Sequence, residues 1–242
     1  MLAKWLHESS YTVVLTGAGM STESGLPDFR SAKSGLWTKE DPTQLASTDA
    51  LNRNVEKFFE FYRKRVLGLK QCKPHKGYDI LVKWEKEGII RSIITQNVDG
   101  FHEEAGSKNV AELHGTLKRV HCQTCKKEYD NETYVKEKFY CECGGKLRPS
   151  VVLFGEMLPE AALLKATQET EKADLFIVLG SSLSVSPANH FPLMAKSHGA
   201  KLVIVNMEPT DFDDYADLVI NDRKIGDVLT EVDEQLEALK TK

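Results

Sequence analysis

The residues with the clearest chemical potential begin with Thr16-Gly17-Ala18-Gly19-Met20-Ser21, a glycine-rich motif that follows an apolar run. Glycines directly after a strand let the backbone approach a phosphate group, and a helix that begins there offers N–H donors. Because position 22 is Thr and not Gly, the motif matches the dinucleotide-binding fingerprint only in part. A tight strand-to-helix turn without a ligand is the alternative interpretation.

The next motif, Gly25-Leu26-Pro27-Asp28-Phe29-Arg30-Ser31, brings a fixed proline, an aromatic ring and a guanidinium into one short loop. Such a loop suits a lid over a cofactor, because Phe29 offers an apolar cover and Arg30 a positive charge. An ordinary surface loop is the alternative.

Four of the five cysteines fall in two close pairs, Cys122 with Cys125 and Cys141 with Cys143. Two such pairs, about 15–20 residues apart, are typical of a tetrahedral Zn²⁺ site. Four thiolates leave no open position on the ion, so we expect a structural rather than a catalytic zinc. His121 as a substitute ligand and four free thiols are the weaker alternatives. The fifth cysteine, Cys72, is expected to be a reduced, incidental thiol.

Amide and carboxylate side chains follow another apolar run in Thr95-Gln96-Asn97-Val98-Asp99. Such groups are costly to bury without partners, and a bound polar ligand would supply them. The alternative is a helix start capped by Asp99. His114 ends a short apolar run and precedes Gly115, so we expect it at a strand end facing the same cleft, although a lone histidine is more often structural.

These motifs need strands that bring them to one edge. The predicted strands are residues 11–16, 89–95, 175–179, 202–205 and 218–220, and helical patterns cover 55–69, 74–86, 159–172, 188–196 and 225–239. Strands that are apolar throughout and separated by helices indicate a parallel sheet covered on both faces, which is a doubly wound α/β fold. Such folds bind ligands beyond the carboxyl ends of their strands, where Gly17, Gln96, Ser181 and Asn206 stand. In the helix over 159–172 we expect Leu163, Leu164 and Thr167 to face inward.

Composition sets limits on the function. The chain has 242 residues, 41% of them apolar and 28% charged, with a net charge of −4, which fits a globular protein and excludes a basic nucleic-acid coat. No apolar run reaches the ~18 residues of a membrane span, and no signal peptide is visible, so we expect a cytoplasmic protein with reduced thiols. The basic run from Arg63 to Lys76 is either a solvated helix face or a surface for an anionic partner.

In their order along the chain, the motifs resemble those of the sirtuins, a family of NAD-dependent protein lysine deacylases. The resemblance covers about residues 8–230 and is closest to compact bacterial members. It rests on G-A-G-M-S at 17–21, G-L-P-D-F-R at 25–30, T-Q-N-V-D at 95–99, H-G at 114–115, the paired cysteines, F-G-E at 154–156, G-S-S-L at 180–183 and V-N at 205–206.

The resemblance implies one catalytic domain over residues 1–242, with a Rossmann-like doubly wound parallel sheet and a small zinc-ribbon domain. The Rossmann-like part would comprise about residues 1–30, 75–115 and 150–242. The small domain would come from two insertions, a helical one at about 31–74 and the zinc ribbon at about 116–149. NAD and an acetyl-lysine peptide would meet in the cleft between the two parts.

The resemblance also assigns residues to the cofactor. Those expected to contact NAD are Ala18, Ser21 and Thr22 at the phosphates and ribose, Phe29 and Arg30 in the lid, Gln96, Asn97, Val98, Asp99 and His114 at the nicotinamide end, and Ser181, Ser182, Asn206 and Ile225 at the adenosine end. Val152 and Phe154 would line the acyl-lysine tunnel, and Gly155 and Glu156 would pair with the peptide backbone as a strand addition.

The implied reaction removes an acetyl group from lysine and yields nicotinamide and O-acetyl-ADP-ribose. His114 would act as the general base on a ribose hydroxyl, as a histidine can near neutral pH, and Asn97 would assist. The protein partners would be acetylated lysine substrates, with nucleic acid and membranes not expected and a monomer favoured. A protein mono-ADP-ribosyltransferase with the same NAD pocket is the alternative, and a non-enzymatic zinc-ribbon module is a weaker one.

Sirtuins that prefer succinyl or malonyl groups resemble one another in a Tyr-x-x-Arg pair on the helix after the lid. Aligned by its flanking residues, Arg63 falls at the arginine of that pair and Glu60 falls at the tyrosine. A carboxylate there would repel an acidic acyl group, so this alignment predicts neutral acyl substrates.

Overall fold

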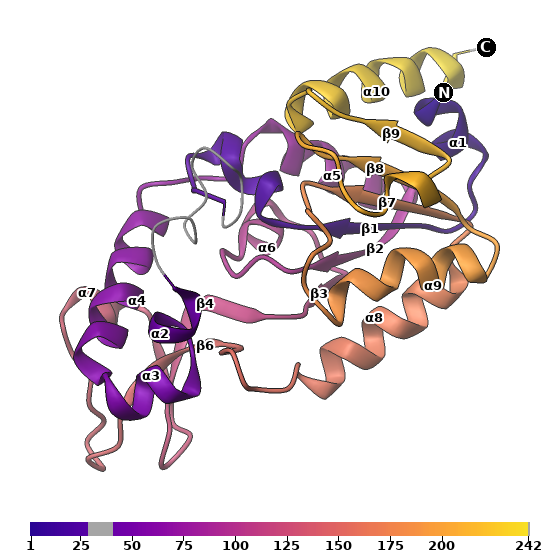
Figure 1. Ribbon diagram of the computed structural model, residues 1–242. Coiled ribbons are helices and arrows are strands. Elements are labelled where there is room, and N and C mark those ends of the chain that lie inside the picture. The colour runs from indigo at the N-terminus through magenta and orange to yellow at the C-terminus, as the bar shows by residue number, and fades with distance from the viewer. Residues whose placement is uncertain (29–40, 242) are drawn as a thin grey trace.

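The computed structural model describes residues 1–28 and 41–241, and within them a six-stranded parallel sheet forms the centre of the fold (Figure 1). Its strands are β1 (Thr12–Thr16), β2 (Ile90–Thr95), β3 (Val110–Glu112), β7 (Leu175–Leu179), β8 (Lys201–Val205) and β9 (Leu218–Ile220). The strand order is β3-β2-β1-β7-β8-β9, so the direction of winding reverses between β1 and β7. This confirms the predicted doubly wound α/β fold, whose ligands bind at that switch point.

The strands form because their sequences are β-branched and apolar on both faces. Every residue of β1 and β7 is buried, and the two strands pair in parallel from Thr12 with Leu175 to Thr16 with Leu179. The five predicted strand segments are confirmed to within one residue, and the short edge strand β3 is the apolar run before His114, for which no bounds were predicted.

Helices cover both faces of this sheet (Figure 1). On one face lie α1 (Leu2–Glu8), α5 (Lys76–Lys86) and α10 (Ile225–Lys240), and on the other lie α8 (Glu160–Lys172) and α9 (Phe191–Ser197). The short helix α6 (Phe101–Ala105) follows β2. The 3₁₀ helices of the described residues, η1 (Ala18–Ser24), η3 (Ala188–His190) and η4 (Asp213–Tyr215), lie in loops.

Two expectations for these helices need correction. The prediction that Leu164 faces inward on α8 is wrong: its side chain is 56% exposed, and Ala166 and Thr170 are the residues buried there. The helix predicted over 188–196 begins instead as η3 and continues as α9, because Pro192 lies in the first turn of α9, where its missing N–H costs nothing.

A second group of elements lies to one side of the large sheet (Figure 1). It contains α2 (Pro42–Leu45), α3 (Thr48–Arg53), α4 (Val55–Leu69), α7 (Glu132–Val135) and an antiparallel sheet ordered β5-β4-β6. The strands of that sheet are β4 (Gly115–Cys122), β5 (Glu128–Asp130) and β6 (Leu147–Val151). We call this group the small lobe. Phe59 of α4 stacks on Phe139 with ring centroids 4.6 Å apart and meets Tyr134 edge-on, which packs the helical and ribbon parts together.

The basic run on α4 and after it is largely paired with acidic residues. Arg63 lies 2.8 Å from Glu137, Lys70 pairs with Glu132, and Lys76 lies 2.9 Å from Asp227. Lys64 pairs with Glu60 one turn earlier on α4. These pairs tie α4 to the ribbon and α5 to α10, so they favour the interpretation of a solvated structural face over a surface for an anionic partner.

Within the described part of the chain, none of the helices has both the length and the apolar composition needed to cross a membrane.

Candidate functional site

A cleft of about 1050 Å³ opens at the carboxyl ends of the strands, between the large sheet and the small lobe. The cofactor candidates that line it are Ala18, Thr22, Gln96, Asn97, Val98, His114, Ser181, Ser182, Asn206 and Ile225. The substrate candidates Val152, Phe154, Gly155 and Glu156 line it as well. The predicted residues therefore line one continuous cleft although they come from seven separate segments of the chain.

Two predicted cofactor residues lie behind this surface instead of lining it. Ser21 is 2% exposed and Asp99 is 6% exposed, and neither is among the residues that line the cleft. Phe29 and Arg30, the predicted lid residues, lie outside the described residues.

The glycine-rich motif meets the loop after β7 at very close range. The Gly17 N–H donates to the Leu179 carbonyl at 3.0 Å, and the Gly19 N–H donates to the Gly180 carbonyl at 2.8 Å. A Cβ on Gly17 would lie 2.6 Å from the Gly180 carbonyl oxygen, and Gly180 has a φ of +65°. The glycines are thus required for the two loops to touch. The segment that follows is the 3₁₀ helix η1 rather than an α-helix.

His114 stands between β3 and β4 with a defined tautomer. Its Nδ1 lies 2.9 Å from the Gln96 backbone carbonyl oxygen. A carbonyl can only accept, so Nδ1 carries the proton and Nε2 carries the ring lone pair. Since His114 lines the cleft, the ring has the protonation pattern that a general base requires.

Asn97 is held by a buried network under the cleft floor. Its Nδ2 donates to the Gly17 carbonyl at 2.9 Å and to Ser21 Oγ at 3.1 Å. The Ser21 hydroxyl donates to Asp99 Oδ2 at 2.7 Å, so the Tyr78 hydroxyl, 2.8 Å from Ser21 Oγ, is the donor in that contact. All four side chains are therefore fixed by one another.

Asp99 also bonds to the start of the helix that follows β2, but the N-cap residue of that helix is Gly100, so the alternative that placed Asp99 at the N-cap is wrong by one residue. Its Oδ1 accepts the Phe101 N–H at 2.9 Å at the start of α6. Burial raises the pKa of the Asp99 carboxyl, while the hydrogen bonds from Ser21 and Phe101 act in the opposite direction.

The substrate candidates form a loop that is bonded on both sides. The Val152 N–H donates to the His114 carbonyl at 2.9 Å, and the Phe154 N–H donates to the Ala46 carbonyl at 2.9 Å. The Glu156 N–H closes a turn onto the Leu153 carbonyl at 3.0 Å, so it points into its own loop and not toward a peptide. Phe154 remains 40% exposed at the cleft.

The sequence alignment matched Glu60 and Arg63 to the Tyr-x-x-Arg pair of sirtuins that prefer acidic acyl groups, but these two residues do not lie at the cleft. Arg63 pairs with Glu137 and Glu60 pairs with Lys64, and neither lines the cleft. Tyr62 and Arg65, which have the same Tyr-x-x-Arg spacing two residues later, line it instead. The prediction that a Glu60 carboxylate at the cleft repels acidic acyl groups is therefore wrong.

One feature of the sequence could have identified Tyr62 and Arg65 as the cleft residues. Tyr62 already belongs to the apolar stripe of α4 and is 2% exposed, and burial raises its pKa to about 12. Arg65 lies three residues further along the same face, with its guanidinium carbon 5.9 Å from the Tyr62 ring centroid.

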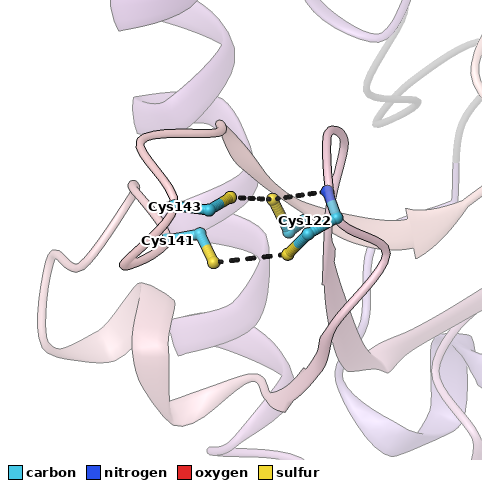
Figure 2. Close-up of side chains that lie close together, drawn as sticks. Cys122, Cys141 and Cys143 are labelled. Atoms are coloured by element: carbon cyan, nitrogen blue, oxygen red, sulfur yellow. Dashed lines mark hydrogen bonds between the residues drawn. The ribbon is translucent and has the colours of Figure 1, made fainter.

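The four predicted zinc ligands converge in the small lobe (Figure 2). Their sulfur atoms all lie within 4.8 Å of one another, with 3.5 Å between those of Cys122 and Cys143 and 3.7 Å between those of Cys125 and Cys141. Four sulfurs at ~2.3 Å from one tetrahedral Zn²⁺ lie about 3.8 Å apart, so the donor set and its spacing fit this ion.

The surroundings support bound thiolates. The Tyr129 hydroxyl lies 3.0 Å from Cys141 Sγ and lowers the pKa of that thiol to about 6. A Cβ on Gly145 would lie 2.6 Å from Cys122 Sγ, so only glycine leaves room for the cluster. All four sulfurs are committed to one another, which makes the site structural. His121 is not part of the cluster and instead contacts Ser150 Oγ at 2.9 Å.

Comparison with known proteins places the chain in a family. The model of the Sir2 family matches residues 17–187. An NAD-dependent protein deacetylase of Oceanobacillus iheyensis is 61% identical over 96% of this chain and 98% of its own length. One of Geobacillus kaustophilus is 59% identical over 97% of each chain.

Solved structures agree with these relatives. A Sir2 structure with a deacetylated p53 peptide and 3′-O-acetyl ADP ribose superposes with a TM-score of 0.92 at 39% identity, over 97% of this chain and 96% of that one. A Sir2 homologue in complex with ADP ribose gives a TM-score of 0.94 at 39% identity, over 100% of this chain and 98% of the other.

The family model and these relatives place the chain among the NAD-dependent protein deacetylases. Within that class, this chain belongs to the Sir2 family. It is an NAD-dependent protein deacetylase, and its cofactors are NAD and one structural Zn²⁺.

Proposed function

We propose that His114 is the general base of the deacetylation and that Asn97 assists it beside the reacting centre. The observation that carries this proposal is the hydrogen bond from His114 Nδ1 to the Gln96 carbonyl, which places the ring lone pair on Nε2. The same bond fixes the ring plane at the cleft, so the base needs no reorientation before it takes a proton.

NAD, when bound, supplies the ribose carbon that accepts the acetyl oxygen as nicotinamide leaves, which makes O-acetyl-ADP-ribose a product. The chain's part is to hold that molecule. Ala18 and Thr22 lie at the close-packed glycine loop and suit its phosphates, and Ser181, Ser182 and Asn206 suit the adenosine half. Gln96, Val98 and Ile225 complete the wall. Ser21 and Asp99 act from behind by fixing Asn97.

The protein substrate enters, in this proposal, along residues 152–156. Val152 and Phe154 flank the acyl-lysine side chain, and the peptide backbone pairs with Gly155 and with the Glu156 carbonyl. The Glu156 N–H takes no part because it is bonded to Leu153. Phe29 and Arg30 stay predicted cofactor contacts.

The deciding experiment is mass spectrometry of an acetyl-lysine peptide incubated with and without NAD. We expect a loss of about 42 Da from the peptide, only with NAD, together with O-acetyl-ADP-ribose in the small-molecule fraction. NAD labelled in its adenosine half distinguishes the alternative function. Label that stays on protein would identify ADP-ribosyl transfer and would overturn the role given to His114.

A second candidate function is the removal of acidic acyl groups such as succinyl from lysine. The observation that favours it is the presence of Tyr62 and Arg65 at the cleft, where a guanidinium and a phenol can bind a carboxylate. We expect Arg65→Gln to lower kcat/KM for a succinyl-lysine peptide by at least tenfold more than for an acetyl-lysine peptide. Arg63→Gln is the matched control, because Arg63 points to Glu137. Equal losses on both peptides would reject the second function.

We further propose that the large sheet with its helices and the small lobe correspond to the two parts expected from the sequence, with boundaries near residues 31, 75, 116 and 150. The cysteines support work in the cytoplasm, because none of them forms a disulfide and four are grouped to hold a metal ion, which requires reduced sulfur. A monomer is proposed as well, and light scattering after size-exclusion chromatography tests it: a mass near twice 27.2 kDa would contradict it.

A further inference from the structure

A bidentate, largely buried ion pair joins β6 to the loop of the proposed peptide site. Arg148 of β6 is 5% exposed, and its guanidinium donates to Glu156 through two bonds, from Nη1 to Oε1 at 2.5 Å and from Nη2 to Oε2 at 2.9 Å. Nη2 also donates to the Val151 carbonyl at 2.5 Å. Such a paired fork is the strongest and most directional side-chain contact that arginine makes.

Glu156 also forms hydrogen bonds within the loop that lines the cleft. Its Oε2 also accepts the Leu153 N–H at 2.9 Å, while its own N–H donates to the Leu153 carbonyl. The loop 153–156 is thus closed at both ends, around Gly155 with a φ of +93°. Although burial alone would raise the pKa of the Glu156 carboxyl, the bonds from Arg148 and Leu153 lower it. The carboxylate is therefore kept charged for this purpose.

Arg148 lies in the strand pair that adjoins the cysteine cluster. In the antiparallel pair β4–β6, Cys122 lies opposite Leu147 and His121 lies opposite Arg148. The Gln123 N–H donates to the Lys146 carbonyl at 2.9 Å, immediately beside the cysteine cluster. Because side chains alternate along a strand, a slip of one residue in this pair would turn Arg148 to the opposite face. The cysteine cluster adjoins this strand pair, because Cys122 lies opposite Leu147, the residue before Arg148.

We propose that Arg148 and Glu156 form a positioning pair through which the register of the zinc ribbon holds loop 152–156 in its peptide-binding shape. Neither carboxylate nor guanidinium takes part in the chemical step. The inference rests on the proposed peptide site along that loop. It explains how a closed metal site that cannot bind substrate still contributes to substrate binding.

The test uses the zinc-loaded protein and the variants Glu156→Gln, Arg148→Lys and their combination. Glu156→Gln keeps the size of the side chain but removes its charge, and Arg148→Lys keeps the charge but removes the fork. We expect each single variant to weaken binding of a fluorescent acetyl-lysine peptide by roughly tenfold or more, measured by anisotropy. The double variant should bind no worse than the weaker single variant, because both changes remove the same contact.

Two further readouts separate positioning from general damage. Affinity for ADP-ribose by calorimetry and zinc content by absorption should stay at the wild-type values in the variants. Glu137→Gln is the matched control, since Glu137 also pairs with an arginine of the small lobe but is 64% exposed. We expect it to bind peptide as the wild type does.

Wild-type peptide binding in Glu156→Gln would overturn the proposal, and so would a parallel loss of ADP-ribose affinity or zinc. If Arg148→Lys does not fold, Glu156→Gln decides by itself. A wild-type protein that yields no deacetylated peptide with NAD would refute the proposed function, whereas a productive wild type with an unaffected Glu156→Gln would refute only this inference.

Discussion

At the residue scale, the role proposed for His114 depends on one hydrogen bond as well as on its imidazole ring. A histidine that donated from Nε2 would have its lone pair on Nδ1, and the Gln96 carbonyl excludes that tautomer here. The backbone therefore sets the side chain's chemistry.

We predict that His114→Ala retains the fold and the zinc but loses at least 100-fold in deacetylation rate, because general-base catalysis contributes about 10²–10⁴-fold. Product formation from an acetyl-lysine peptide measures the rate, and circular dichroism and zinc content check the fold. Near-normal turnover would remove His114 from the mechanism.

Glu112 makes a pH-dependent contribution to stability. It ends β3 with its side chain 15% exposed, and burial, followed by the nearby Glu103 carboxyl, raises its pKa to about 7. The folded state therefore binds a proton more tightly than the unfolded state. The stability that this provides is complete below about pH 4.5 and is lost as the pH rises through about 7.

We predict that Glu112→Gln matches the wild type near pH 4 and exceeds it near pH 8 by on the order of 1–3 kcal/mol in the free energy of unfolding. Urea unfolding at the two pH values measures this difference. The exposed Glu137→Gln serves as control and should show no such divergence. A constant offset between Glu112→Gln and wild type at both pH values would contradict the raised pKa.

At the element scale, the two loops at the switch point can meet only because three glycines face one another. Gly180 has a φ of +65°, and a Cβ at this position would lie only 2.3 Å from the Met20 backbone nitrogen. Gly68, inside α4, has an ordinary φ and open space at its Cβ.

We predict opposite effects of the same substitution at these two sites. Gly180→Ala should destabilise the protein by about 1–3 kcal/mol or more and weaken NAD binding, because the loops must separate. Gly68→Ala should stabilise it by about 0.5–1 kcal/mol through higher helix propensity. Denaturant midpoints and calorimetric NAD titrations measure both. If Gly180→Ala changed neither the stability nor the NAD affinity, the two loops would not need glycine at this position.

At the scale of the whole molecule, one hydrophobic cluster joins the small lobe to the large sheet. Val14 and Ile93 of the large sheet, Tyr62 of α4, and Cys122 and Cys141 of the ribbon all belong to it. A second cluster fills the other face of the sheet. The ribbon is thus part of the main hydrophobic core and does not form a separate core.

We predict that the zinc-loaded protein unfolds in a single calorimetric transition and that zinc removal by a chelator lowers the midpoint of that transition. The metal binds only folded ribbon, so its loss removes stability from everything that unfolds with the ribbon. A separate low-temperature transition after chelation, with the main transition unmoved, would show that the ribbon unfolds independently.

Pattern and spacing along the chain predicted the parallel sheet, the cleft at its switch point and the grouping of four cysteines, whereas most of the named cleft residues came from the family resemblance. Apolar strands with polar residues after their last position can be recognised without any coordinates, because burial on both faces demands them. The cysteine pairs are equally local signals.

Only the tertiary structure decided which of several candidates on an element faces the cleft. Tyr62 and Arg65 line the cleft, whereas Glu60 and Arg63 do not. Asp99 and Ser21 lie behind the residues that line the cleft, and the Leu164 side chain faces solvent. Motif spacing places a residue in a segment, but packing against other segments sets the rotation of a helix and the depth of a side chain. The pairing of Arg148 with Glu156 depends on strand register, which sequence spacing alone leaves undetermined.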